Sequence, residues 1–145
     1  MSASSLVSFT LFLGACAPVI RTDAPTAPSH LPEASPVNAL QGTWIYSQDP
    51  TGQIPVDPIY TDSTLTFGAD GHYAFQLGQT RIALEGSWVL TSAEGDVLRI
   101  HTEYGQGRRN DLALTLRRGA SGAAVGMEVR EGDGSTGARY YVPRP

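Results

Sequence analysis

Apolar and polar residues alternate with a period of two from Leu40 to the end of the chain. Such alternation is typical of β-strands with one face in a core and the other in water. The segment RIALEGSWVL, residues 81–90, is a clear case, and its predicted inward side comprises Ile82, Leu84, Trp88 and Leu90. No ten-residue stretch of the sequence shows the 3.6-residue period of an amphipathic helix. We therefore expect an all-β domain.

A hairpin is predicted near the start of this domain. The alternating segments TLTF (64–67) and HYAFQL (72–77) are separated by Gly68 and the turn Ala69-Asp70-Gly71. The Asp-Gly pair accepts the positive φ angles that tight hairpin turns require. We therefore expect these two strands to pair with each other.

Further alternating segments follow, and glycine-rich turns separate them. They are VLRIHTEY (97–104), DLALTL (111–116), AVGMEV (124–129, with Val125, Met127 and Val129 inward) and ARYYV (138–142). Counted from GTWIYS (42–47), the sequence holds eight short strands at a spacing of about ten residues, which predicts a barrel or a sandwich. Closure into an antiparallel up-and-down barrel is favoured, because the two edge strands then satisfy each other's hydrogen bonds.

Six aromatic residues fall on the predicted inward positions: Trp44, Phe67, Phe75, Trp88, Tyr104 and Tyr140. Eight short strands enclose an interior that side chains can just fill. These aromatic residues therefore form either a packed core or the walls of a ligand cavity.

The first thirty-nine residues have a different character. LVSFTLFLGA (6–15) is apolar but much shorter than the roughly 20 residues that span a bilayer. The residues after it are crowded with proline, alanine, serine and threonine, so a buried strand would find no neighbour to pair with. We interpret residues 1–15 as a signal peptide, 16–39 as a disordered, proline-rich tether, and 40–145 as the barrel domain.

The end of the apolar segment resembles bacterial lipoprotein precursors, whose lipobox has the form Leu, small, small, Cys. Leu13, Gly14, Ala15 and Cys16 match it position by position. The resemblance implies cleavage before Cys16 and attachment of lipid to its sulfur. Ala17 follows the cysteine, which resembles the pattern of export to the outer membrane. The implied location is the cell envelope, with the membrane as a partner through the lipid and the domain facing the periplasm or the cell surface.

The start of the domain resembles lipocalin-like small barrels of bacteria, whose first strand carries a Gly-x-Trp motif. Gly42, Thr43 and Trp44 match this motif. In that family the tryptophan lies across the closed end of the barrel and stacks on a basic side chain from near the C-terminus. The resemblance implies that Arg139 or Arg144 plays this part in barrel closure.

Charge and reactive residues narrow the possible functions. The formal net charge is -4, and the basic residues are scattered rather than gathered in a patch, so no nucleic-acid partner is expected. The single cysteine can form no disulfide within the chain, and the three histidines are not spaced as metal ligands. We expect no metal and no cofactor.

Catalytic chemistry is also not expected. The sequence holds no nucleophile elbow, phosphate-binding loop or zinc-protease motif. His101 shares the predicted outer face with Arg99 and Glu103. This group is either a solvated strand face with an exposed ion pair or a catalytic or pH-sensing site, and we expect the former.

The segment DPTGQIPVDPIYT (49–61) is longer than a hairpin needs and contains Ile54, Val56, Ile59 and Tyr60. It could cap the barrel mouth, dock on a partner, or pack over one end for stability.

The function expected from these features is that of a membrane-anchored, non-enzymatic lipoprotein that binds a small apolar ligand or an envelope protein. Two alternatives remain. One is a periplasmic protease inhibitor of the small-barrel type, in which the proline-rich segment enters the protease cleft. The other is a structural or assembly component of the envelope.

Overall fold

The computed structural model describes residues 35–134 and 136–145. Their elements are α1 (Pro36–Leu40), β1 (Gly42–Tyr46), the 3-10 helix η1 (Pro58–Tyr60), β2 (Thr64–Phe67), β3 (His72–Gln76), β4 (Ala83–Glu94), β5 (Val97–Tyr104), β6 (Arg108–Arg118), β7 (Ala124–Glu131) and β8 (Arg139–Pro143). The predicted signal peptide, Cys16 and most of the predicted tether lie outside the described residues.

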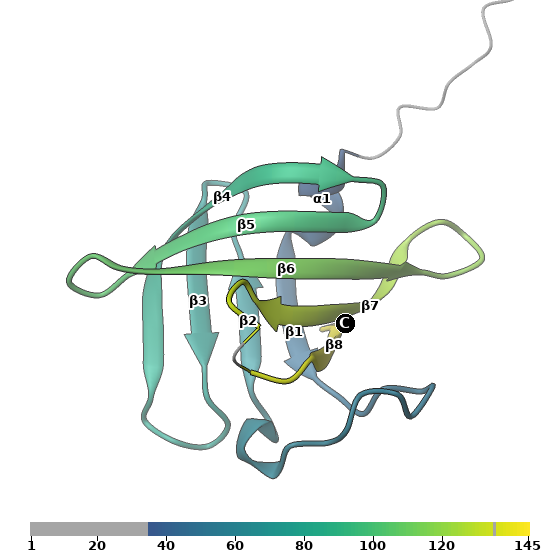
Figure 1. The fold of residues 1–145 in the computed structure, drawn as a ribbon, viewed down its shortest axis with the longest axis horizontal. Coiled ribbons are helices and arrows are strands. Elements are labelled where there is room, and N and C mark those ends of the chain that lie inside the picture. Colours follow the sequence, from purple (N-terminus) through teal and green to yellow (C-terminus); the bar gives the residue numbers. More distant parts are fainter. Residues whose placement is uncertain (1–34, 135) are drawn as a thin grey trace, which may run out of the picture. The chain divides into compact units, whose positions relative to one another are not determined.

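The strands form a closed antiparallel barrel (Figure 1). Each strand pairs with the next in the sequence, and β8 pairs with β1 through Ile45 and Val142. The predicted eight-stranded up-and-down barrel is therefore confirmed, and the sandwich is ruled out. Closure pairs every one of the eight described strands on both sides, so none of them offers a free edge to another chain.

The predicted hairpin is present as β2 and β3. Leu65 lies opposite Phe75 and Thr66 lies opposite Ala74. Gly71 has a φ of 82°, and Asp70 accepts a hydrogen bond from the backbone N–H of His72 at 2.9 Å. The Asp-Gly pair thus supplies both the positive φ and a side-chain acceptor for the turn.

One end of the barrel is closed by α1. Leu40, at its end, is fully buried, and its carbonyl accepts a hydrogen bond from Trp44 Nε1 at 2.9 Å. Gly42 joins helix to strand with a φ of 124°, which residues with a Cβ rarely adopt. Val37 and Ala39 also pack against the core, so the last residues assigned to the tether belong to the folded domain.

Two residues predicted to face inward are exposed instead: Ile82 and Val125. Ile82 lies just before β4, at the end of the loop from β3, where its carbonyl accepts a hydrogen bond from the Leu77 N–H. At Val125 the cause is a register shift, since Arg117 pairs with Gly126 and the next residue of β6 pairs with Ala124. This bulge reverses the alternation, so Ala124 packs on the core and Val125 faces solvent.

Candidate functional site

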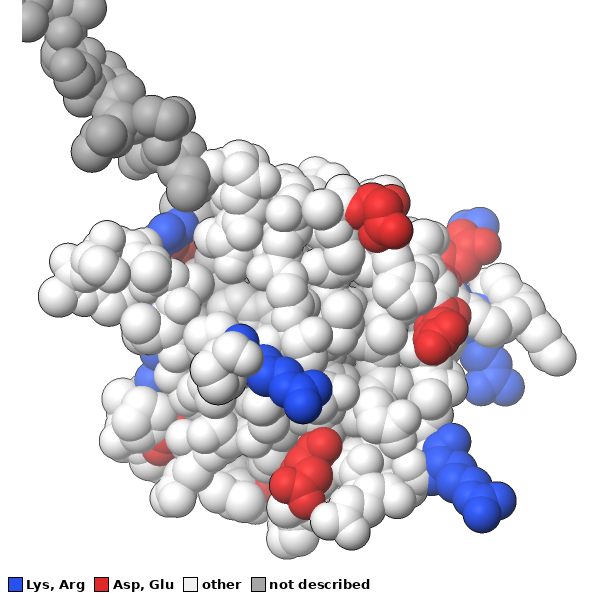
Figure 2. All heavy atoms as spheres, turned by 180° about the vertical axis from the view of Figure 1, so that it is seen from behind, with Lys and Arg blue, Asp and Glu red and all other residues white. Residues whose placement is uncertain are grey.

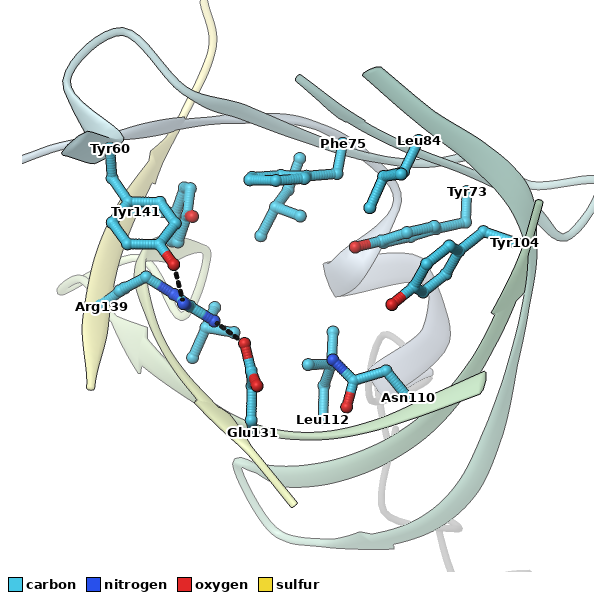
Figure 3. A pocket seen from close by; sticks show the side chains of 12 residues that line it. Tyr60, Tyr73, Phe75, Leu84, Tyr104, Asn110, Leu112, Glu131, Arg139 and Tyr141 are labelled. Carbon is cyan, nitrogen blue, oxygen red and sulfur yellow. Dashed lines mark hydrogen bonds and ion pairs between the residues drawn. The ribbon is translucent and has the colours of Figure 1, made fainter. Parts of the chain in front are cut away.

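The two ends of the barrel interior differ in content. The end beside α1 is packed with apolar side chains, among them Trp44, Phe67, Trp88, Leu98, Leu114, Leu116 and Met127. The other end contains a cavity of about 100 Å³. Its lining consists of Tyr60, Leu65, Tyr73, Phe75, Leu84, Tyr104, Asn110, Leu112, Val129, Glu131, Arg139 and Tyr141 (Figure 3).

The cavity walls have an apolar part and a polar part. Phe75 and Leu84 come from the paired strands β3 and β4. In Figure 3 the polar ends of Arg139 and Glu131 lie across the cavity from the hydroxyls of Tyr73 and Tyr104. A molecule in this space would meet ring and methyl groups together with hydrogen-bonding groups.

Arg139, on β8, is the central polar residue of the cavity. Its side chain is 10% exposed, its Nη1 donates to the Tyr60 hydroxyl at 2.7 Å, and its Nη2 lies 3.1 Å from Glu131 Oε1. The guanidinium also lies over the Tyr60 ring, 4.5 Å from its centroid. Its Nε is buried and has no hydrogen-bond partner among the described residues.

The charge of Arg139 is maintained by its neighbours. Burial opposes that charge and would lower the pKa, but Tyr141, Glu131 and Tyr60 outweigh burial, so the pKa of Arg139 is raised. The cavity therefore contains a fixed cation beside the acidic Glu131.

The buried tyrosines of the cavity are kept as neutral hydroxyl groups. Burial raises the pKa of Tyr73 and of Tyr141 well above the ordinary value. The hydroxyls of Tyr73 and Tyr104 make no hydrogen bond with another residue in the part of the chain that the structure describes. Both hydroxyls can therefore serve a guest molecule as donors or acceptors.

The predicted aromatic set divides between three places. Phe75 and Tyr104 line the cavity, whereas Phe67 and Trp88 are buried near the closed end in edge-to-face contact at 5.6 Å. The inward placement of Tyr140 is wrong. Because neighbouring strand residues face opposite sides, the cavity-lining Arg139 and Tyr141 leave Tyr140 on the outer face.

Tyr140 is nevertheless buried, beneath another arginine. The Arg117 guanidinium lies over its ring, 5.0 Å from the centroid. A Cβ at Gly126 would collide with the Tyr140 ring, so the glycine makes room for it. Tyr140 therefore owes its burial to packing outside the barrel.

The expected stack between Trp44 and an arginine does not describe this barrel's closed end. Arg139 lies over Tyr60 rather than over Trp44, and Arg144 is exposed. The helix α1 occupies the closed end in its place, through the hydrogen bond from Trp44 to Leu40.

The segment 49–61 is fixed at both ends to the barrel. At its start, the fully buried Asp49 accepts hydrogen bonds from the backbone of residues 51, 53 and 54, from the Thr51 hydroxyl, and from Arg117 at 2.7 Å. Burial would raise the pKa of Asp49, but the bonds from Thr51, Ile54 and Arg117 outweigh it and hold that pKa far below the usual range. At its end, Tyr60 lies against Arg139 at the cavity wall.

Both placements bear on the predicted roles of this segment. Tyr60 lines the cavity, so the segment does cover part of the barrel mouth. Ile54 is buried, while Val56 and Ile59 are exposed. A groove of about 420 Å³ lies on the outer side, and Tyr60 and Arg139 line it as well.

The histidines are distributed as separate residues. His101 Nδ1 lies 2.7 Å from Asp111 Oδ1 on the neighbouring strand β6, a partner that was not predicted. His72 is exposed beside the turn, and His30 lies outside the described residues. Within residues 35–134 and 136–145, no three His, Cys, Asp or Glu side chains could hold a metal ion. No helix in this part of the chain is long and apolar enough to cross a membrane.

Sequence reasoning missed two polar residues that it could have found. Glu131 lies two positions after the inward-facing Val129, and Asn110 lies two positions before the inward-facing Leu112. A polar residue at the next inward-facing position of a strand, two residues from an apolar one, indicates a polar cavity. Comparisons with protein-family models, with curated proteins and with solved structures find no match to this chain.

Proposed function

We propose that the barrel is a non-enzymatic binding module whose cavity holds a small molecule. The observation that carries this proposal is the pair of hydroxyls on Tyr73 and Tyr104, which point into the cavity and make no hydrogen bond with another residue in the described part of the chain (Figure 3). A hydroxyl that has no partner within the protein can bond to a guest molecule, and such a hydrogen bond contributes about 0.5–1.5 kcal/mol. Arg139 and Glu131, across the cavity from these hydroxyls, add further hydrogen-bonding groups.

The size of the cavity limits the ligand. Drug-sized ligands occupy pockets of roughly 300–1,000 Å³, and an engineered cavity of about 150 Å³ binds benzene. A cavity of about 100 Å³ therefore holds a group of only a few heavy atoms. With its polar lining, it suits a small, partly polar group better than the apolar ligand expected from the sequence.

Filling the cavity tests this proposal. Leu84 lines the cavity and Val89, on the same strand, is exposed on the outer face. We expect Leu84→Trp to abolish binding of small molecules of four to eight heavy atoms, and Val89→Trp to leave it intact. Ligand-observed NMR on the full chain measures this. A panel of such molecules that fails to bind the wild-type protein would overturn the proposal.

We also propose that a lipid on Cys16 anchors the protein to the cell envelope, at the outer membrane. The support is the lipobox match at residues 13–16, which lie outside the described part of the structure. Cys16→Ser removes the acceptor sulfur, so the variant should leave the detergent phase in a bacterial host. Intact mass should show that the mature wild-type protein begins at Cys16 with added acyl chains, and a different start or no added mass would contradict it.

The surface offers less support for a specific partner. Figure 2 shows acidic and basic side chains interspersed on the face drawn, with uncharged residues between them. A mixed surface of this kind gives no strong field toward one charged partner. The proposal therefore rests on the cavity.

A further inference from the structure

The Tyr60–Arg139 pair is a wall shared by two spaces. On its inner side is the cavity of about 100 Å³, and on its outer side is the groove of about 420 Å³. The groove is lined by the residues Pro55, Val56, Asp57, Pro58, Tyr60, Thr136, Gly137, Ala138 and Arg139. A ligand with one end, its head, in the cavity could therefore extend its other end, its tail, into the groove if the Tyr60 ring moved aside.

The walls of the groove are largely apolar. They include Pro55, Val56 and Pro58, beside the polar Asp57 and Thr136. The groove thus suits an apolar tail.

The charges in the cavity determine which charge the head of the ligand can carry. Arg139 Nη2 lies 3.1 Å from Glu131 Oε1, so the two charges compensate each other. A carboxylate head would bring a second anion beside Glu131, and an ammonium head would bring a second cation beside Arg139. Either would place an uncompensated charge in a partly dry site, which is costly.

A neutral head avoids that cost and can bond to both sides of the cavity. Its acceptor atom would take a hydrogen bond from the hydroxyl of Tyr73 or Tyr104, and its N–H would donate to Glu131. A planar group with an acceptor and a donor on neighbouring atoms is an amide, a lactam or a urea. Its few heavy atoms also fit the volume of the cavity.

We propose that the cavity binds the neutral amide-type head of a ligand whose apolar tail passes Tyr60 into the outer groove. This inference rests on the proposed binding function. It predicts that, among ligands of equal size, a neutral head binds more tightly than a charged one. It also predicts that affinity increases with the length of the apolar tail.

Three matched probes test the head: propionamide, propionate and propylammonium, titrated into the full chain and followed by NMR. We expect propionamide to bind at least about tenfold more tightly than either ion, because each ion adds a charge that the Arg139–Glu131 pair does not compensate. Hexanamide tests the tail. Each methylene that becomes buried strengthens binding by about fourfold, so hexanamide, which has three methylenes more than propionamide, should bind at least about tenfold more tightly.

Glu131→Gln tests the origin of the charge selectivity. It removes the charge that compensates Arg139, so propionate should become the tightest of the three short probes. Glu128→Gln is the matched control, because Glu128 pairs with Arg130 and Arg117 away from the cavity lining. That variant should keep the wild-type order.

The outcomes separate this inference from the proposed function. Binding that is blocked by Leu84→Trp but strongest for propionate in the wild-type protein would overturn the amide head and leave the binding function standing. Equal affinities for hexanamide and propionamide would overturn the passage into the groove. Failure of every probe, with failure of the wider panel as well, would overturn both proposals. The wild-type probe order decides the point even if Glu131→Gln does not fold.

Discussion

Two arginines hold the same loop to the barrel, one from outside and one from inside. Arg117 lies on the outer face over Tyr140 and binds Asp49 near the start of the loop. Arg139 lies at the cavity over Tyr60, near the end of the loop. Each guanidinium combines an acidic partner with an aromatic ring, an arrangement that the planar group of arginine favours.

The two sites differ in how fully their polar groups are used. Asp49 accepts five hydrogen bonds, including the one from Arg117, and its side chain has no exposed surface. Arg139 keeps a buried Nε without a partner in the described residues. A saturated site can only hold the loop in place. Arg139 also lines a cavity, so its site can bind a guest as well as hold the loop.

The largest expected effect comes from removing each guanidinium. Arg117→Met should lower the melting temperature by about 10 °C, and Arg139→Met by less than half as much. The reason is that Asp49 loses its countercharge without access to water, whereas the Glu131 side chain is 25% exposed and can be hydrated.

Arg130→Met is the control for this comparison. Arg130 pairs with Glu128 on the surface, and its side chain is largely exposed, so its loss should change the melting temperature little. Thermal unfolding of the three variants measures the order. A larger loss for Arg139→Met than for Arg117→Met would contradict the assignment of the outer site as the structural one.

Acid should weaken the outer site. Because the pKa of Asp49 is lowered on folding, its carboxylate stabilises the folded state above the unfolded pKa of 3.8, and this contribution is lost as the pH falls below that value. Asp49→Asn removes the titrating group. Urea unfolding between pH 7 and pH 2 should therefore show a steeper decline in the free energy of unfolding for the wild-type protein than for this variant. Parallel declines would show that Asp49 does not carry the acid sensitivity.

The barrel itself could be predicted from the sequence because its determinants are local. A period of two assigns each strand, and the Asp70-Gly71 turn sets the first hairpin. These signals lie within a few residues of one another. Closure then follows from the number of strands and the need to satisfy the two edges.

The site depends on information that local patterns do not hold. Arg139 and Tyr60 are 79 residues apart, and Arg117 and Asp49 are 68 apart, so no spacing in the sequence joins them. Two adjacent tyrosines leave the parity of the last strand undecided, so the sequence pattern alone puts Tyr140 in the interior. The pattern also puts Val125 on the wrong face, because one bulge reverses the alternation.

Alkali should weaken the inner site. Burial raises the pKa of Tyr73. The contribution of its neutral hydroxyl to the free energy of unfolding is therefore fully present below the unfolded pKa of 10.0, and it is lost as the pH rises above that value. Tyr73→Phe should flatten the decline in the free energy of unfolding between pH 9 and pH 11.5. Tyr141→Phe should act in the same way, because its pKa is also raised. If neither variant alters that decline, the cavity tyrosines do not titrate with unfolding.

The smallest effect separates the two aromatic partners. Tyr60→Phe and Tyr140→Phe both keep a ring beneath the guanidinium, so the stacking contact survives in each. Only Tyr60 uses its hydroxyl, as the acceptor for Arg139 Nη1 at 2.7 Å, while Tyr140 has no hydrogen bond through its hydroxyl to another described residue. Tyr60→Phe should therefore lower the free energy of unfolding by about 1 kcal/mol, and Tyr140→Phe should leave it nearly unchanged. Urea unfolding of the two variants at pH 7 measures the difference. An equal loss in both would mean that the hydroxyl bond inside the barrel adds nothing to the ring contact, and that the inner and outer arginines hold the loop by the same means.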